Sequence, residues 1–354
     1  MEKYRQELEE NGIPQKSLTS IEQYAKHWFS LRNGNHNSPR TAERERLDIR
    51  HIIELFPDVE LKQLTPLVIK TAYDEARISG RFDKEIYQIN KRLRQILNSA
   101  IEDGLIKKNP ALKVTIPKPE PKEKDYLDPI RIAKFNSLLL NTPLSGEVIA
   151  SHILLHNGFR PGEVYAFSWS SFSFSTSRFF VGSQFSNDMK LRSPKSKASK
   201  DWAVVDGDLW AILFEWKQIQ REYLISIGVQ QTEETPIASN SLGGRLDPTN
   251  FGRWFRNFCA DNGFGKFTIV TKTFKRDGKT IERGKGYEGL CPNMFRDIFS
   301  TQLVTNIKVD PRTLQSRMRH SDPSISLRNY THPVLEEEYA SAEAYSKLIS
   351  RNGR

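Results

Sequence analysis

The strongest constraint on this chain is the segment KVTIPKPEPKEKDY at positions 113–126, which has three prolines in five positions. Proline fixes φ and lacks a backbone donor, so the segment can neither extend a helix nor enter the middle of a sheet. It shows no apolar period, which predicts an extended linker. We therefore expect an extension at 1–18, a helical unit at 19–112, a linker at 113–127, a second unit at 128–332 and a tail at 333–354.

The first unit has the apolar spacing of short helices. Thr19 and Glu22 fit a capping box, Pro39 opens a second segment, and Thr65 is a cap before Pro66 at the first helical position. The first and fourth helices each collect apolar side chains on one face: Ile21, Tyr24, Ala25, Trp28, Ile86, Ile89, Leu93, Ile96, Leu97 and Ala100. The pattern predicts a small bundle of about four helices.

The second unit begins at Asp128, a cap followed by a first-turn proline, and its pattern is mainly helical. One run of strand-like segments interrupts the helices: Phe172 to Phe174, Arg178 to Val181, Lys190 to Ser193 and Trp202 to Val205. These segments predict a small antiparallel sheet of about three strands. The expected fold class is mainly α with a small antiparallel sheet.

A further alternating region, Phe267 to Ile281, contains Asp277-Gly278, a dipeptide typical of hairpin turns. It carries four cations: Lys272, Lys275, Arg276 and Lys279. Two interpretations stay open, a basic hairpin that lies along phosphates and a hairpin whose charges are merely solvated.

The charge balance points to a polyanionic partner. Lys and Arg number 53 and Asp and Glu 43, which gives a formal net charge of +10 at pH 7, so nucleic acid is expected. Cys259 and Cys291 lack metal-ligand spacing and are too few for a disulfide framework, which favours a reducing cytosol. The N-terminus is charged where a signal peptide is apolar, and no apolar stretch is long enough to span a membrane. We expect no membrane partner and a cytoplasmic, nucleoid-associated protein.

The stretch HNGFRPGEVYAFSW places Arg160 directly before Pro161, where a turn becomes a helix. Backbone donors converge at a helix N-terminus, which makes this a suitable place to hold a phosphate. Glu163, one turn further on, is placed to accept from the guanidinium and fix its direction. A structural Arg–Glu pair is the alternative interpretation.

Two later stretches carry further polar candidates. In CPNMFRDIFSTQLV, Arg296 belongs to a helix whose Phe295 and Phe299 face the core, and an arginine beside such a face needs a partner or an anion. The stretch MRHSDPSISLRNYTH holds His320 and, ten positions later, Tyr330. By itself this last stretch fits a surface turn followed by a packed tyrosine.

Taken in order, GFRPGEV, NMFRDIFST and MRHSDPSISLRNYTH resemble the two arginine boxes and the final box of the tyrosine recombinase family, also called phage integrases. The stretch LRQILNSAIEDGLIKKNP is similar to the end of that family's core-binding domain, so the resemblance covers nearly the whole chain. It implies a helical, SAM-like core-binding domain, an α+β catalytic domain of the DNA breaking–rejoining type, and an integrase of a mobile element.

The resemblance also implies the site residues. SPKSKASKDWAVV is similar to the hairpin that carries the family's catalytic lysine, and we take Lys195 as the first choice and Lys197 as the second. Asn293 stands where the family usually has a histidine, and the interval from His320 to Tyr330 is one residue longer than usual. The remaining catalytic set is two phosphate-binding arginines, the late histidine and the nucleophile: Arg160, Arg296, His320 and Tyr330.

These residue types suit phosphodiester chemistry. Two guanidiniums neutralise the non-bridging oxygens bidentately without losing a proton at neutral pH, which replaces a magnesium ion. A covalent phosphotyrosine conserves the energy needed to reseal the strand, so neither ATP nor another cofactor is expected. A lysine suits the general acid that protonates the leaving 5′ oxygen. No zinc spacing, Walker loop or nucleophile elbow competes with this set.

Double-stranded DNA is the implied partner, with phosphate contacts from Lys91, Arg92, Arg94 and the basic hairpin. The resemblance further implies a homotetramer on two DNA sites, a tail that docks on a neighbouring subunit, and an accessory DNA-bending or directionality factor. Two alternatives stay open: supercoil relaxation like that of a type IB topoisomerase, and a DNA-binding protein of this fold without catalysis, for which Asn293 and the longer interval are the motivation.

Overall fold

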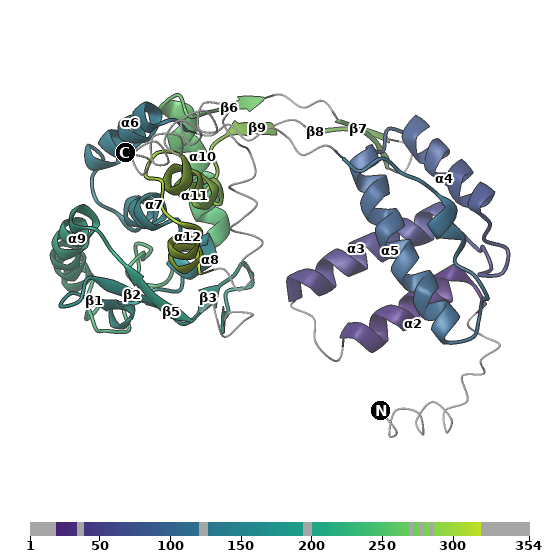
Figure 1. Ribbon diagram of the computed structural model, residues 1–354, viewed down its shortest axis with the longest axis horizontal. Helices are drawn as coiled ribbons and strands as arrows, with labels where there is room; N and C mark the ends of the chain where they lie inside the picture. The colour runs from purple at the N-terminus through teal and green to yellow at the C-terminus, as the bar shows by residue number, and fades with distance from the viewer. Residues whose placement is uncertain are drawn as a thin grey trace, which may run out of the picture. The chain divides into compact units, whose positions relative to one another are not determined.

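The structure is a computed structural model that describes residues 19–33, 39–119, 127–193, 200–268, 272–276, 279–283 and 286–319. The chain divides into two compact units, Met1–Glu123 with Thr271–Arg283, and Lys124–Val270 with Gly284–Arg354. Each unit has its own core of buried apolar side chains, and Figure 1 shows the elements of each. The predicted class, mainly α with small antiparallel sheets, is confirmed.

Helices form the first unit: α2 (Ile21–Asn33), α3 (Pro39–Leu55), α4 (Pro66–Ile78), α5 (Asp83–Glu102) and the short 3-10 helix η2 (Pro110–Lys113). α4 begins as predicted, because the Thr65 side chain accepts a hydrogen bond from the Val68 N–H at 3.2 Å and Pro66 follows the cap. All ten apolar residues predicted to face inward from α2 and α5 are buried.

Two features of the first unit lie at other positions than the sequence predicted. The capping box of α2 is formed by Ser20 and Gln23, whose side chains each accept from the other's backbone N–H; the sequence had favoured Thr19 and Glu22. The reason is that α2 starts at Ile21, which makes Ser20 the residue before the first helical one. Val114 and Ile116, assigned to the linker, are buried in the core of the first unit.

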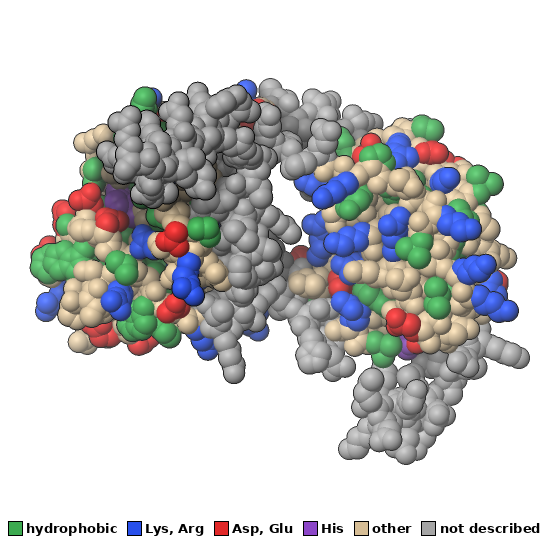
Figure 2. All heavy atoms as spheres, viewed as in Figure 1, with side chains coloured by type: hydrophobic (Ala, Val, Ile, Leu, Met, Phe, Trp, Pro, Cys, Tyr) green, Lys and Arg blue, Asp and Glu red, His purple; other side chains and the backbone are tan. Residues whose placement is uncertain are grey.

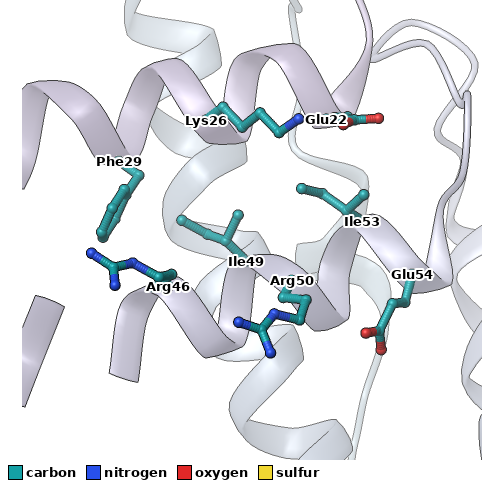
Figure 3. A pocket seen from close by; sticks show the side chains of 8 residues that line it. All are labelled: Glu22, Lys26, Phe29, Arg46, Ile49, Arg50, Ile53 and Glu54. Atoms are coloured by element: carbon teal, nitrogen blue, oxygen red, sulfur yellow. Dashed lines mark hydrogen bonds and ion pairs between the residues drawn. The ribbon is translucent and has the colours of Figure 1, made fainter. Parts of the chain in front are cut away.

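A groove of about 430 Å³ lies between α2 and α3 (Figure 3). Phe29, Ile49 and Ile53 give it apolar walls, and its charged lining residues are of both signs: Glu22, Lys26, Arg46, Arg50 and Glu54. Glu22 and Lys26 form an ion pair with each other. Because a rim of mixed sign does not select a polyanion, we place no DNA contact in this groove.

The second unit packs helices around a small sheet. Its helices are α6 (Pro129–Leu140), α7 (Gly146–Asn157), α8 (Pro161–Val164), η3 (Trp169–Ser171), α9 (Gly207–Ser226), α10 (Pro248–Asp261), α11 (Met294–Thr305) and α12 (Pro311–Met318). α6 starts at the predicted cap, where the Asp128 side chain accepts from the Arg131 N–H at 2.7 Å. α7 is almost entirely buried, so it forms the centre of this unit.

The predicted antiparallel sheet is present as β1 (Phe172–Ser173), β2 (Arg178–Val181) and β5 (Asp201–Val204), in the order β1-β2-β5. The segment predicted near Lys190 belongs instead to a separate two-stranded ladder, β3 (Gln184–Phe185) with β4 (Leu191–Arg192). Phe179, Val181 and Ala203 turn into the core, whereas Phe180 and Trp202 are exposed. This alternation is the pattern of a sheet with one buried face.

The predicted basic hairpin is confirmed as β7 (Lys272–Arg276) paired with β8 (Lys279–Arg283). The register places Arg276 opposite Lys279, which leaves two residues between the strands, Asp277 and Gly278; these two lie outside the described residues. β6 (Gly265–Thr268) and β9 (Gly286–Gly289) form a second ladder that brackets the hairpin in sequence.

Candidate active site

The first arginine stretch forms a sharp turn between α7 and α8. Gly158 ends α7 in the left-handed region, with φ of 57°, and a Cβ placed there would lie 2.7 Å from the ring of Phe299. Phe159 is fully buried, which anchors the turn, and Arg160 follows as the residue before α8. The turn therefore needs glycine for both conformation and space, and its apolar anchor sets where the arginine emerges.

Glu163 orients Arg160 as predicted. Its carboxylate accepts from the Arg160 backbone N–H at 2.9 Å and from the Arg160 Nη1 at 2.9 Å. The Glu163 side chain is buried, whereas 44% of the Arg160 side chain is exposed. The bond from the backbone N–H holds the carboxylate in place, and the bond from Nη1 fixes the direction of the guanidinium, which leaves an exposed part that can receive an anion.

Arg296 lies on α11 directly after Phe295, which is buried against Phe135 and Phe255. The Arg296 Nη1 donates to the Gly158 carbonyl at 3.0 Å, and the Nη2 donates to the Met318 carbonyl. These two acceptors end α7 and α12 respectively, where helices present unpaired carbonyls and partial negative charge. Arg296 thus joins the first arginine turn to the end of α12.

Arg319 is a member of this cluster that the sequence reasoning missed. It caps α12 with φ of 50° and is 4% exposed. Its Nη2 donates to the Glu163 carboxylate at 3.0 Å, and its guanidinium lies 4.6 Å from the centre of the Phe159 ring. The only local signal was an arginine directly before His320, which is too weak to reveal a partner 156 positions away.

The carbonyl of Val204 draws two more segments together. It accepts from the Asn157 side chain at 2.8 Å and from the Arg317 Nη1 at 3.0 Å. Val204 ends β5, an edge strand of the sheet, and a free edge offers unpaired backbone carbonyls. The first arginine turn, the strand that follows the two candidate lysines, and the helix that precedes the candidate histidine therefore converge.

The electrostatics of the cluster show an excess of positive charge. Burial would raise the pKa of Glu163, but Arg319 and Arg160 together hold it below its usual value. Burial, followed by the charge of Arg160, lowers the pKa of Arg296 to about 9, and burial lowers the pKa of Arg319. A guanidinium penalised by burial and by like charges is stabilised by an anion.

Of the other predicted catalytic-site residues, the structure describes only Asn293. Lys195, Lys197, His320 and Tyr330 lie outside the described residues, so their roles stay predictions. Asn293 is exposed at the start of α11, and its side chain makes no capping hydrogen bond to that helix.

The predicted DNA contacts from α5 differ among themselves. Lys91 is exposed. Arg92 pairs with Glu45 at 2.8 Å and Asp48 at 3.2 Å. Arg94 donates to the backbone carbonyls of Ala111, within η2, and Val114, directly after it. Arg92 and Arg94 therefore use side-chain donors in contacts within the first unit. The DNA-binding roles of Lys91, Arg92 and Arg94 stay predictions.

Lys and Arg side chains gather on the face of the first unit that Figure 2 shows. Only the backbone of the basic hairpin is described, so the predicted roles of Lys272, Lys275, Arg276 and Lys279 stay predictions.

Among the described residues, no group of three or more His, Cys, Asp or Glu could hold a metal ion. In the same part of the chain, none of the helices has the length and apolar character needed to cross a membrane.

Comparison with known proteins adds relatives in sequence and in fold. No family model matches the chain. It is 21% identical over 313 residues to the "Tyrosine recombinase XerC-like" protein of Caldanaerobacter subterraneus, covering 82% of this chain and 73% of that one. It is 23% identical over 242 residues to the ICEBs1 integrase of Bacillus subtilis, covering 67% of this chain and 65% of the relative.

Several integrases of known structure share the fold of this chain. The Tn1549 transposon integrase, solved with a circular intermediate DNA, superposes with a TM-score of 0.73 at 17% identity, covering 92% of this chain and 99% of the other. A lambda integrase dimer on a core site gives a TM-score of 0.62 at 14% identity, over 88% and 78% of the two chains. The chain is therefore similar in sequence to a tyrosine recombinase and an integrase, and it shares the fold of the solved integrases.

Proposed function

We propose that this protein is a site-specific recombinase of a mobile element, which cuts and rejoins duplex DNA through a covalent 3′-phosphotyrosine intermediate. The observation that carries the proposal is the cluster around Glu163, in which three arginines meet one directly paired carboxylate. Because Arg160 is the exposed member, the excess charge is presented to an incoming phosphate.

In the proposed reaction, Arg160 and Arg296 neutralise the non-bridging oxygens of the scissile phosphate. The phenolic oxygen of Tyr330 attacks phosphorus, and the bond to the 5′ oxygen breaks. Lys195, with Lys197 as the alternative, gives that oxygen its proton, and His320 donates to the phosphate or helps to remove the tyrosine proton. Attack of a 5′ hydroxyl on the phosphotyrosine reverses the step and reseals a strand.

Two observations about relatives extend the proposal to partners. Lambda integrase has been solved as a tetramer bound to a Holliday junction, with a TM-score of 0.60 and 15% identity to this chain. We infer a homotetramer on two DNA sites for this protein, with residues 333–354 as the subunit contact and a cytoplasmic, nucleoid-associated location. An accessory DNA-bending or directionality factor is part of the same proposal. Recombinases and integrases among the relatives favour strand exchange over simple relaxation of supercoils.

The test is capture of the covalent intermediate. The full chain is incubated with a library of nicked duplexes carrying randomised core sequences, and DNA that stays attached in detergent is recovered and sequenced. A nick just 3′ of the scissile phosphate makes the released piece, which carries the free 5′ hydroxyl, short enough to diffuse away, so the intermediate accumulates. We expect an enriched sequence and a DNA-modified peptide that contains Tyr330.

Tyr330→Phe is the matched control, since it removes one oxygen and leaves the ring. It should bind the enriched DNA with unchanged affinity and form no adduct. Adduct formation by Tyr330→Phe would refute the nucleophile, and specific binding without any adduct in the wild type would favour the non-catalytic alternative. Exchange of strands between two labelled sites would separate recombination from mere relaxation.

A further inference from the structure

Arg319 combines two features that are each unfavourable. A residue with a Cβ disfavours the left-handed region, yet Arg319 has φ of 50°. A buried guanidinium loses its hydration, yet the side chain of Arg319 is 1% exposed. Something specific must hold an arginine where glycine would suit the backbone and an apolar side chain would suit the surroundings.

Arg319 contacts Phe159 and Glu163, which lie on either side of Arg160 in the sequence. Its guanidinium covers the ring of Phe159 at 4.6 Å. Its Nη2 donates at 3.0 Å to the Oε2 of Glu163, and the same oxygen accepts the Arg160 backbone N–H at 2.9 Å. Arg319 therefore contacts both Phe159, which anchors the turn, and the Glu163 carboxylate, which orients Arg160.

Glu163 is the junction through which Arg319 acts. Its Oε1 holds the Arg160 side chain at 2.9 Å, while its Oε2 is occupied by Arg319 and the Arg160 backbone. With Arg319 in place, the two oxygens have distinct partners and the carboxylate has one orientation. Without it, a buried carboxylate would be free to rotate toward Arg160 or toward Arg296, the third guanidinium that interacts with it.

We propose that Arg319 is a positioning residue of the phosphate site: through Glu163 it holds the Arg160 turn and the end of α12 in one arrangement. Arg296 makes a second contact with the end of α12, because it donates to the carbonyl of Met318. The next residue after Arg319 is His320. This inference rests on the proposed function, because it assigns Arg319 a task in the same site.

A direct role for Arg319 as a third phosphate ligand is the competing interpretation. The side chain is almost completely enclosed and already pairs with Glu163, whereas 44% of the Arg160 side chain is exposed. An enclosed, paired guanidinium fits a support for the ligand-binding arginine better than a ligand.

The experiment compares Arg319→Gly, Arg319→Lys and the control Lys308→Gly. Lys308 is exposed and has φ of 58°, so its change to glycine relieves the same backbone strain away from Glu163. The probe is the DNA enriched by wild-type capture, and two quantities are measured, the Kd for that DNA and the single-turnover rate of adduct formation. A misplaced reacting group costs about 10- to 100-fold in rate, and we expect this loss in Arg319→Gly with a Kd within about twofold of wild type. Lys308→Gly should match wild type in both.

A double-variant cycle tests whether the effect passes through Glu163. If it does, Arg319→Gly combined with Glu163→Gln should be no slower than Glu163→Gln alone, whereas independent roles would multiply. Arg319→Lys restores the charge without the planar fork, and we expect a rate between those of wild type and Arg319→Gly. A large rise in Kd for Arg319→Gly would support the third-ligand interpretation and overturn the proposal.

Two further measurements keep the outcome decisive. If Arg319→Gly does not fold, Arg319→Lys replaces it, and a wild-type adduct rate in that variant overturns the proposal. Heteronuclear NMR of the labelled Arg160 guanidinium, without DNA, should show one ordered environment in wild type and increased motion when Arg319 is changed. This readout does not depend on catalysis, so unchanged Arg160 order refutes the positioning role, whereas absence of any wild-type adduct refutes the proposed function instead.

Discussion

Each of the two units contains a network of arginines and carboxylates, and the two networks differ in charge balance. In the first unit, Arg92 pairs with two carboxylates, Glu45 and Asp48, whose side chains are 2% and 9% exposed. Arg32 pairs with Glu45 as well, at 3.2 Å. Arg44 also pairs with Asp48, at 3.6 Å, but the side chains of Arg32 and Arg44 are 45% and 61% exposed. The most enclosed arginine of this network, Arg92, is 14% exposed and has two carboxylate partners of its own.

In the second unit, one buried carboxylate is shared by two directly paired arginines. Glu163 pairs with Arg160 at 2.9 Å and with Arg319 at 3.0 Å, while Arg296 lies close enough to influence the same carboxylate. A folded protein gains nothing for its own stability from such an excess of buried charge. The difference teaches how to separate structural arginines from functional ones: a compensated network stabilises the fold, and an uncompensated one is prepared for an anion.

The largest effect should come from removing the exposed arginine of the uncompensated network. Arg160→Gln keeps a donor but loses the charge, and loss of one such electrostatic contact costs about 10²- to 10³-fold in rate. Adduct formation with the captured DNA measures it. Thermal stability should stay near that of wild type, because the side chain is half-exposed. A stability loss larger than the activity loss would contradict the distinction between the two networks.

Gly158→Ala should be the most destabilising change near the site. The left-handed φ and the approach of Phe299 to 2.7 Å from the added Cβ should together cost about 2–4 kcal/mol in unfolding free energy. The carbonyl that Arg296 uses would move with the turn, so adduct formation should fall as well. Gly104→Ala is the control in the first unit, because its φ of 74° is similar but nothing lies within 4 Å of an added Cβ. Urea unfolding of both variants decides, and equal losses would contradict the role assigned to Phe299.

Arg92→Met should lower the stability of the protein, whereas Arg160→Gln should lower the rate of adduct formation. It removes the charge that compensates Glu45 and Asp48 while it keeps the apolar stem, and we expect a loss of about 2–3 kcal/mol in the stability of the first unit. Lys91→Met, on the adjacent exposed residue, is the control and should leave stability nearly unchanged while it weakens DNA binding. If Arg92→Met weakened DNA binding without destabilising the protein, Arg92 would be a phosphate contact after all.

Sulfate should give the smallest effect and the one most specific to the uncompensated network. An anion that relieves the repulsion among Arg160, Arg296 and Arg319 stabilises the folded state, and occupancy at about ten times the Kd contributes about 1.4 kcal/mol. The shift should appear as a higher Tm in sulfate than in chloride of equal ionic strength, and Arg160→Gln should reduce it.

The pH dependence of the sulfate effect follows from the lowered pKa of Arg296, about 9. Below that pH Arg296 is charged and the site attracts sulfate; as pH rises through it, Arg296 loses its proton in the anion-free protein and the gain should shrink. A gain that grows between pH 7 and pH 10 would contradict the assignment.

Much of the architecture was predictable from local patterns. The caps at Thr65 and Asp128 and the inward faces of α2 and α5 depend on residues within a few positions of one another, and the structure has them as predicted. Local rules were less reliable where two candidates are adjacent, as with Thr19 and Ser20, because a shift by one residue changes no periodicity.

The site was predictable in part for the same reason. Phe295, directly before Arg296, is buried as the sequence predicted. Phe159, directly before Arg160, is buried as well, but the sequence analysis had not predicted it as the anchor of that turn. The sequence by itself did determine that Glu163, three residues after Arg160, would orient that arginine, since the spacing is local.

Only the tertiary structure decided which arginines share a site and which are already compensated. The Arg296 bond to Gly158 spans 138 positions, and the Arg319 bond to Glu163 spans 156. Arg92 likewise pairs with Glu45 across 47 positions, a contact that the sequence analysis did not predict. Contacts at such separations leave no periodic trace in a single sequence, because they depend on how whole elements pack, and packing is determined by the apolar residues around these arginines.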